Sequence, residues 1–292
     1  MKVNLNIPSP IAEIKSDLIS KKKLKVYVKR EDLIHPIISG NKWRKLKYNF
    51  ELIKKNKIKE VLSFGGAYSN HLHALSWYAN TQKIKSIGIV RGNESDELNS
   101  TLSFCKKNNM DLYYLDRDIY RINKYSNNLI NDLNKKYKNI YMIPEGGCNY
   151  LGIKGCEEIL FEEDEKFDFI CASFGTGCTS AGIINSLRKN EYFLAFSSLK
   201  GGERMRDNIS KMCNHSKNWQ IISNYHFGGF ARKNKELDLF IQNFYLKHKI
   251  ILDPVYTAKL FFGIFDLISN NYFKTNSKIL IIHTGGLQGI QK

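Results

Sequence analysis

Residues 38–46 read I-S-G-N-K-W-R-K-L, and the rest of the chain is organised around this stretch. Gly40 predicts a tight backbone bend, and Asn41 belongs to the residue types that cap the first turn of a helix. From Lys42 to Lys54 the apolar side chains recur at helical spacing, at Trp43, Leu46, Phe50 and Ile53. We therefore expect a helix over Lys42 to Lys54 with Asn41 as its N-cap and one buried apolar stripe.

Lys42 is the candidate catalytic residue of this stretch. The positive end of the helix dipole disfavours an ammonium group, so a lysine at a helix start keeps its amine free more readily than a solvated lysine. A free amine attacks aldehydes, and pyridoxal phosphate is the aldehyde cofactor that enzymes hold as a lysine Schiff base. Because 45 of the 292 residues are Lys or Arg, many helix starts look similar, and the hypothesis needs support from elsewhere in the chain.

Composition predicts a globular protein with either one large core or two smaller ones. Of the 292 residues, 42% are apolar and 12% are aromatic. The N-terminal residues do not resemble a signal peptide, and no apolar run approaches the roughly 20 residues that span a bilayer. The six cysteines include no C-x-x-C pair, which favours reduced thiols over disulfides or a metal site. We expect a cytoplasmic protein with no membrane partner.

The net charge of +17 raises the possibility of nucleic-acid binding. A nucleic-acid site needs a clustered basic face, whereas the lysines here are spread over most of the expected helices. Solvated helix faces explain that distribution, so we expect no nucleic-acid partner. A basic surface would still attract an anionic small molecule.

Short apolar runs alternate with longer amphipathic runs along the chain. The short runs predict strands at Lys25 to Lys29, Val61 to Ser63, Ser86 to Val90, Asp111 to Leu115, Ile140 to Ile143, Asp168 to Ser173, Tyr192 to Ser197, Gln220 to Ser223 and Lys278 to His283. The longer runs predict helices at Lys42 to Lys54, Asn70 to Asn80, Glu97 to Asn108, Ile122 to Tyr137, Gly155 to Glu163, Thr179 to Lys189, Lys235 to Lys249 and Ala258 to Asn270. This alternation indicates parallel crossovers and an α/β fold, in which ligands bind beyond the carboxyl ends of the strands.

The turn after the second expected strand reads F-G-G-A-Y-S-N-H-L-H from Phe64. Ser69, Asn70 and His71 open the next helix and bring hydroxyl, amide and backbone N–H groups to its N-terminus. Such an arrangement binds a carboxylate or a phosphate. An ordinary N-cap made by Ser69 or Asn70 is an equally good interpretation of this turn alone.

The turn after Asp168 to Ser173 reads F-G-T-G-C-T-S-A-G from Phe174. Gly175 and Gly177 let the backbone approach an anion, Thr176 and Thr179 add hydroxyl donors, and the helix that follows points its dipole at the same place. The turn is neither a Walker loop nor a G-x-G-x-x-G dinucleotide motif. We expect a phosphate cradle, although turns of this kind also occur without a ligand.

The last turn is T-G-G, with Thr284 at the carboxyl end of the final expected strand. Its hydroxyl could donate to a ring nitrogen or cap a plain turn, and the plain turn is the simpler interpretation.

Taken together, the motifs resemble those of fold-type II pyridoxal phosphate enzymes, and most closely the family of 1-aminocyclopropane-1-carboxylate deaminase and D-cysteine desulfhydrase. The resemblance runs through P-S-P-I-A at Pro8, K-R-E-D-L at Lys29, G-N-K-W-R-K-L at Gly40, F-G-G-A-Y-S-N-H at Phe64, P-E-G-G at Pro144, G-T-G-C-T-S-A-G at Gly175, D-P-V-Y-T-A-K at Asp253 and H-T-G-G at His283. It implies a fold of the tryptophan synthase β type, in which each of two domains is a mostly parallel twisted sheet flanked by helices. Residues 46–150 would form the small domain, and residues 1–45 and 151–292 the large one.

The resemblance also implies roles for single residues. Lys42 would form the Schiff base, Asn70 would meet the 3-hydroxyl of the cofactor, and Thr284 would meet its pyridine nitrogen. The phosphate loop would be Gly175, Thr176, Gly177, Cys178 and Thr179. Ser69, Asn70 and His71 would hold the substrate carboxylate, and Tyr256 would be an active-site tyrosine. Family likeness further suggests a homodimer.

Two positions depart from the cyclopropane deaminases. Those enzymes carry a glutamate directly after the D-P-V-Y tyrosine, where this chain has Thr257, and a second tyrosine 26 positions before the first, where it has Phe230. Both losses argue against opening an unactivated carbon ring, and Thr257 resembles the desulfhydrase side. Cys178 replaces a small residue of the phosphate loop, where its backbone N–H still serves.

These observations lead to the hypothesis of a lyase that acts on a small amino acid such as D-cysteine by α,β-elimination. The products would be a 2-oxo acid, ammonia and, from D-cysteine, sulfide. Lys42 would take the Cα proton, and Tyr256 would assist proton transfer in preference to Ser69. The alternatives are ring-opening deamination, dehydration of a hydroxy amino acid, a cofactor-binding homologue with little catalysis, and a basic nucleic-acid-binding protein.

Overall fold

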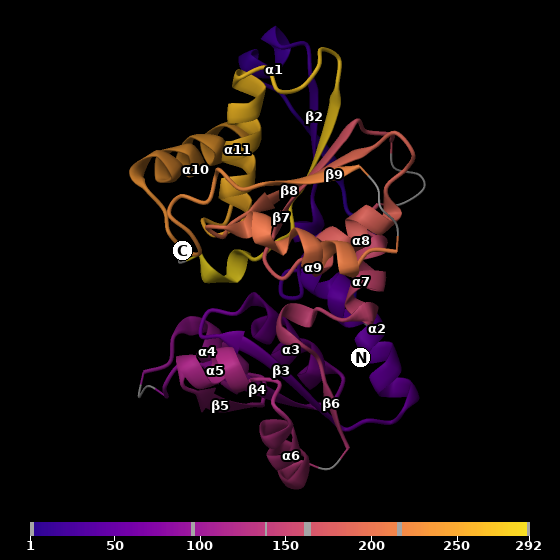
Figure 1. Cartoon of the computed structure of the whole chain (residues 1–292), viewed down its shortest axis with the longest axis vertical. Coiled ribbons are helices and arrows are strands. Elements are labelled where there is room, and N and C mark those ends of the chain that lie inside the picture. The colour runs from indigo at the N-terminus through magenta and orange to yellow at the C-terminus, as the bar shows by residue number, and fades with distance from the viewer. Residues whose placement is uncertain (1–2, 95–96, 138, 161–164, 215–217, 291–292) are drawn as a thin grey trace.

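Two sheets form the framework of the chain (Figure 1). The computed structural model describes residues 3–94, 97–137, 139–160, 165–214 and 218–290. One sheet has six strands in the order β1-β2-β10-β7-β8-β9, and the other has four in the order β5-β4-β3-β6. All described strand pairs are parallel except β1 with β2. The predicted α/β class is therefore confirmed.

The strands are β1 (Ile11–Ile14), β2 (Lys25–Lys29), β3 (Glu60–Gly66), β4 (Lys85–Arg91), β5 (Met110–Leu115), β6 (Ile140–Met142), β7 (Phe169–Phe174), β8 (Tyr192–Ser197), β9 (Trp219–Ile222) and β10 (Lys278–Ile282). The helices are α1 (Asp17–Lys21), α2 (Asn41–Lys55), α3 (Asn70–Thr81), α4 (Ser100–Lys107), α5 (Arg117–Asn123), α6 (Asn127–Lys136), α7 (Tyr150–Glu157), α8 (Cys178–Ser186), α9 (Arg206–Lys211), α10 (Lys235–His248) and α11 (Thr257–Ser269). Short 3₁₀ helices lie at η1 (Glu31–Leu33), η2 (Glu145–Gly147), η3 (Gly202–Met205) and η4 (Leu287–Gly289).

Every strand expected from the sequence is present, whereas β1, α1 and α9 were not predicted. The single helix expected over Ile122 to Tyr137 is wrong. That range contains only the last two residues of α5 and then the whole of α6, because the Ser126 hydroxyl accepts a hydrogen bond from the Leu129 N–H and caps a new helix. The helix expected from Gly155 begins earlier, at Tyr150, where Asn149 caps it, and residues 161–163 of that prediction lie outside the described residues.

Alternate residues of each central strand enter different cores. On the six-stranded sheet, Ile279 and Ile281 of β10 pack with the α10 and α11 side, whereas Leu280 and Ile282 pack with residues of α7, α8 and α9. The four-stranded sheet is covered in the same way by α2, α3 and α4 on one face and by α5 and α6 on the other. Such double cover is what parallel strands require.

In Figure 1, helix α2 starts near the junction of the two parts and runs beside the four-stranded sheet, and it buries its apolar stripe as predicted. Its N-cap, however, is Gly40 and not Asn41, which is the first helical residue. Gly40 has a φ of +59°, and a Cβ there would lie 2.0 Å from the Thr284 carbonyl oxygen. Only glycine fits, so the turn after β10 fixes where α2 begins.

The core around α2 also takes in Ile34, Ile38 and Trp43, which precede residue 46. The division into a small domain of residues 46–150 and a large domain of the remainder stays a prediction. Helix α2 packs closely against α7, which belongs to a core of the six-stranded sheet. A Cβ on Gly155 of α7 would lie 1.8 Å from the Arg44 carbonyl oxygen.

Candidate active site

Lys42 is the second residue of α2, and its surroundings favour a free amine. Burial, and after it the charge of Lys45, lower the pKa of Lys42 from 10.5 to about 7. Its Nζ donates a hydrogen bond to Asn41 Oδ1 at 2.5 Å. The direction of the shift agrees with the sequence-based expectation, although burial and not the helix dipole is its main cause. At neutral pH a large share of the amine is uncharged and able to attack a carbonyl.

The turns singled out in the sequence converge on this amine. Lys42 interacts electrostatically with Cys178 at the start of α8, with Asp253 before α11, and with His71 on α3. Asn41, next to it, donates from its amide to Thr179 Oγ1 at 3.0 Å. The chain therefore brings the start of α2 and the start of α8 into direct contact.

The loop between β7 and α8 has the backbone of an anion cradle. Gly177 is left-handed, with a φ of +86°, and serves as the N-cap of α8. The first intrahelical bond is donated by the Ala181 N–H to the Gly177 carbonyl, which leaves the N–H groups of residues 178–180 without an acceptor inside the helix. The sequence-based expectation of a phosphate cradle thus has the local geometry that it requires, with donors aligned at a helix N-terminus.

Lys45, one turn after Lys42, is a residue that the sequence analysis missed. It is only 4% exposed, and within the described part of the chain its ammonium makes no hydrogen bond or ion pair. The groups that interact with it are Lys42, His71 and the thiols of Cys178, Cys156 and Cys148, and Cys178 is part of the anion cradle. A buried ammonium is costly without a counter-ion, so the site fits a bound anionic group such as a phosphate. Its spacing of three from Lys42 on a predicted helix was the available signal.

Ser69 is the N-cap of α3, where its hydroxyl oxygen accepts from the Leu72 N–H at 3.2 Å. The ordinary capping interpretation is thus present in the structure. It leaves the hydroxyl hydrogen of Ser69 available to a ligand, because capping uses the oxygen only.

His71 is buried, and its contact with Ser63 decides which ring nitrogen carries the hydrogen. The Ser63 hydroxyl lies 2.7 Å from the Ile143 carbonyl oxygen, to which it donates, and 2.9 Å from His71 Nε2. Nε2 must then carry the hydrogen and donate to Ser63, which leaves Nδ1 unprotonated and without a partner in the described residues. Burial, with the charges of Lys42 and Lys45, lowers the pKa of His71 to about 3. The ring is neutral, so a carboxylate at this helix start would be bound by the backbone N–H of His71 and not by its ring.

Asn70 meets the C-terminal turn of the chain. Its amide oxygen accepts from the Gln288 amide of η4, and a Cβ on Gly286 would lie 2.7 Å from Asn70 Nδ2. The side-chain oxygen of Asn70 is therefore occupied, and its NH₂ group is the part that remains to donate. Gln288 was missed by sequence reasoning because 218 positions separate it from Asn70.

Thr284 lies two residues after the end of β10 and directly before Gly285 and Gly286, whose backbones are left-handed. Its carbonyl accepts from the Asn41 N–H at 3.3 Å. Among the described residues its buried hydroxyl has no hydrogen-bond partner, so it can serve a ligand. A plain turn and a ligand partner both remain compatible with that hydroxyl.

Asp253 organises the D-P-V-Y motif. One carboxylate oxygen accepts from the N–H groups of Val255 and Tyr256, and the other accepts from the N–H and the hydroxyl of Thr257. Thr257 is fully buried, and its hydroxyl is committed to Asp253. The position that carries a glutamate in cyclopropane deaminases therefore presents no carboxylate and no free hydroxyl here.

The Tyr256 phenol lies against the anion cradle, since a Cβ on Gly175 would be 3.3 Å from it. Burial is the largest of the causes that raise the pKa of Tyr256, so the phenol stays protonated at neutral pH. The ring of Phe230 packs edge-on against it at 6.0 Å between centroids. Tyr256 thus has a proton to donate, and Phe230 has none.

Other site types find little support. Within the described residues no group of His, Cys, Asp and Glu side chains could hold a metal ion, and the six cysteines are free. None of the described helices has the length and apolar character that a bilayer crossing needs.

Comparison with known proteins gives a consistent result. Residues 5–285 match the family described as pyridoxal-phosphate dependent enzyme. A Pyrococcus horikoshii protein, provisionally named a 1-aminocyclopropane-1-carboxylate deaminase, is 30% identical over 280 residues, which cover 90% of this chain and 85% of the relative. The mitochondrial bifunctional D-cysteine desulfhydrase/1-aminocyclopropane-1-carboxylate deaminase of Arabidopsis thaliana is 28% identical over 294 residues, covering 91% of this chain and 73% of the relative.

Solved structures agree. The crystal structure of a homologue of 1-aminocyclopropane-1-carboxylate deaminase superposes with a TM-score of 0.84 at 27% identity, covering 98% of this chain and 92% of that one. A hydrogen sulfide-producing enzyme from Fusobacterium nucleatum superposes with a TM-score of 0.67 at 14% identity, covering 97% of both chains, which shows a shared fold alone.

Proposed function

Since this chain belongs to the family of pyridoxal-phosphate dependent enzymes, we propose that it is a lyase that removes the β-substituent of a small amino acid, as D-cysteine desulfhydrase does. D-cysteine would give pyruvate, ammonia and sulfide. The observation that carries the proposal is Thr257. Where a ring-opening deaminase has a glutamate, this chain has a buried hydroxyl that is committed to Asp253.

The cofactor fits the residues present. Lys42 would hold it covalently, Lys45 and residues 175–179 would bind its phosphate, Asn70 would donate to its 3-hydroxyl, and the Thr284 hydroxyl would meet its ring nitrogen. When bound, pyridoxal phosphate supplies an electron sink for the negative charge that develops at the substrate Cα.

The chain's own residues would do the rest. The Ser69 hydroxyl and the N–H groups at the start of α3 would orient the substrate carboxylate. The Lys42 amine, whose pKa is lowered to about 7, would take the Cα proton. The Tyr256 phenol remains protonated and would give a proton to the departing β-substituent. A hydroxyl partner such as Thr284 leaves a pyridine nitrogen mostly unprotonated, which suits elimination of a good leaving group.

A second candidate function is ring-opening deamination of 1-aminocyclopropane-1-carboxylate. The name of the Pyrococcus relative favours it, and the bifunctional Arabidopsis relative is named for both activities. Thr257 and Phe230 weigh against it, because the two acid–base groups at those positions of the deaminases are absent here.

A substrate panel separates the two functions. Purified protein should be yellow, and sulfide, pyruvate and 2-oxobutanoate are measured over D- and L-cysteine, serine and 1-aminocyclopropane-1-carboxylate. We expect sulfide and pyruvate from D-cysteine. Release of 2-oxobutanoate from the cyclopropane substrate as the main activity would favour the second function, and a colourless protein that rejects added cofactor would refute both.

Two variants tie the activity to the site. Lys42→Ala should abolish turnover and the covalent attachment of the cofactor, as seen by borohydride reduction and peptide mapping. Lys55→Ala removes an exposed lysine of the same helix and should change neither. A reduced adduct on any lysine other than Lys42 would contradict the assignment.

A further inference from the structure

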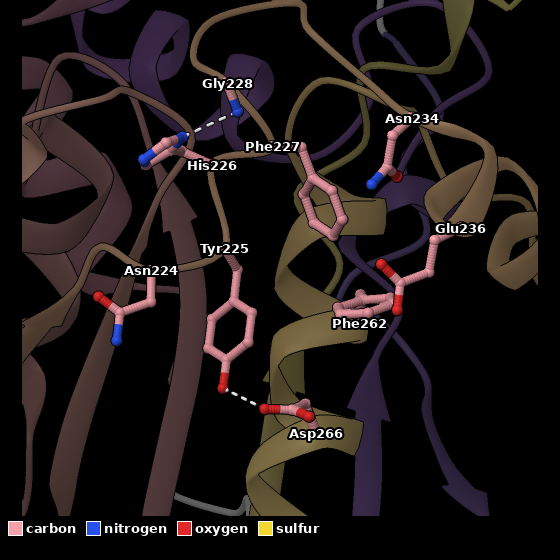
Figure 2. Close-up of a pocket in the computed structure, with 9 residues that line it drawn as sticks. All are labelled: Asn224, Tyr225, His226, Phe227, Gly228, Asn234, Glu236, Phe262 and Asp266. Carbon is pink, nitrogen blue, oxygen red and sulfur yellow. Dashed lines mark hydrogen bonds between the residues drawn. The ribbon is translucent and has the colours of Figure 1, made fainter.

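A loop after β9 is fastened along one face of α11. The Tyr225 hydroxyl donates to Asp266 Oδ2 at 2.6 Å, and the ring of Phe227 packs edge-on against Phe262 at 5.0 Å (Figure 2). The Tyr225 ring also lies so close to Gly263 that a Cβ there would be 2.6 Å from it. Phe262 and Gly263 lie four and three residues before Asp266, so the three contacted positions face the same side of α11.

Lys259 lies on the same side of α11 and holds the loop by its backbone. It is 1% exposed, and its Nζ donates to the carbonyl oxygens of His226 at 2.9 Å and Gly229 at 2.8 Å. Within the described residues no carboxylate forms an ion pair with it. The hydrogen-bond partners of the buried ammonium are therefore two backbone carbonyls of the loop. Burial lowers the pKa of Lys259 to about 8.

The loop needs such a support. Phe227, Gly228, Gly229 and Ala231 all have left-handed backbones, with φ values of +51°, +91°, +122° and +55°. Left-handed φ is unfavourable for residues that have a Cβ, and it persists only where surrounding contacts enforce it. An open surface depression of about 390 Å³, lined in part by Phe227, Phe262 and Asp266, borders the loop (Figure 2), so the loop is open to solvent on that side.

Phe230 follows directly after the residues that Lys259 holds. Its ring packs against Tyr256, which precedes α11 and lies three positions before Lys259. We propose that Lys259 is a positioning residue, which fixes the loop of residues 225–230 so that Phe230 forms a wall of the substrate site opposite Tyr256. The wall would limit the size of the β-substituent and set the pose in which the Tyr256 phenol can reach it. The inference rests on the proposed function for its kinetic readout only.

The test is Lys259→Met in the full-length, cofactor-loaded protein, with Lys235→Met, an exposed lysine of α10, as the matched control. Two amides report the loop directly, since the Gly229 N–H donates to the His226 carbonyl and the Arg232 N–H donates to the Gly229 carbonyl. In Lys259→Met both amides should lose protection from hydrogen exchange by about tenfold or more. kcat/KM for D-cysteine should fall about tenfold, mainly through KM, whereas Lys235→Met changes neither readout.

Phe230→Ala provides a second route that leaves Lys259 in place. It should reproduce the kinetic loss without exposing the Gly229 amide, and the double variant should be no slower than the worse single variant. Unchanged exchange at Gly229 in Lys259→Met, or kinetic losses that multiply in the double variant, would overturn the proposal. If even the wild-type protein turns over no amino acid, the proposed function fails, whereas hydrogen exchange at Gly229 still decides whether Lys259 holds the loop.

Discussion

Replacing Lys45 by methionine should have opposite effects on cofactor binding and on the stability of the cofactor-free protein. Methionine keeps most of the side-chain volume and removes the charge. Because the ammonium is buried and unpaired among the described residues, its removal relieves a desolvation cost. We therefore expect the free energy of unfolding of the cofactor-free protein to stay the same or to rise by about 1 kcal/mol.

Cofactor affinity should move the other way. A hydrogen bond to a charged group contributes about 1.5–3 kcal/mol. Losing one between Lys45 and the phosphate would weaken the binding of pyridoxal phosphate by about tenfold to about 150-fold. Free inorganic phosphate should also bind the wild-type protein more tightly than Lys45→Met. It should therefore protect the wild-type protein better against thermal unfolding.

Absorbance titration of the cofactor-free protein measures the affinity, and urea unfolding measures the stability. Lys55→Met, which changes an exposed lysine of the same helix, should leave both unchanged. A cofactor affinity of Lys45→Met within about twofold of wild type would show that Lys45 does not bind the phosphate. A loss of more than about 2 kcal/mol of stability in the cofactor-free variant would show that Lys45 supports the fold.

Three further predictions concern stability and pH. Gly155→Ala should lower the free energy of unfolding in urea by about 1–3 kcal/mol, because its Cβ would lie 1.8 Å from a carbonyl oxygen of α2. Gly289→Ala, with open space around it, should lower it by less than about 0.5 kcal/mol. Similar losses in the two variants would contradict the close helix contact. The rate of cofactor uptake should rise between pH 6 and 8 and then level off, since the neutral fraction of Lys42 grows from about a tenth to about nine-tenths over that range. A rate that keeps rising tenfold per pH unit above pH 8 would indicate an unperturbed lysine. Tyr141→Phe removes the hydrogen bond at 2.8 Å to Asn49 Oδ1 and should lower the unfolding free energy by about 1 kcal/mol; no change in the urea midpoint would mean that water replaces the phenol.

Much of the fold could be predicted because its signals are local. Strands and helices alternate with a clear change of hydrophobic period, and each expected strand is present. Lys42 was predicted as the reactive lysine from a glycine, a following apolar stripe and its place at a helix start, and the structure confirms the stripe and the helix start. Parallel crossovers bring the carboxyl ends of strands to one edge, so the sequence also indicated which turns should gather around it.

Prediction from the sequence was wrong at two helix starts, where two local signals competed. Asn41 is a good capping residue, yet Gly40 takes that place because the Thr284 carbonyl leaves no room for a Cβ. The helix expected through Ser126 is broken because the serine hydroxyl caps α6. In both cases the deciding contact is a matter of a few ångströms, which hydrophobic periodicity does not encode.

The sequence by itself determined the α/β class and indicated the candidate reactive lysine and the turns that accompany it, because periodicity, glycine content and helix starts depend on neighbours within one or two turns. Only the tertiary structure decided that Lys45 has no counter-ion among the described residues, that Gln288 donates to Asn70, and that Lys259 donates to the loop before Phe230. These facts depend on which groups meet across tens to hundreds of residues. The role of a charged group or an amide depends on which groups lie next to it in the folded protein. Local sequence patterns do not contain that information.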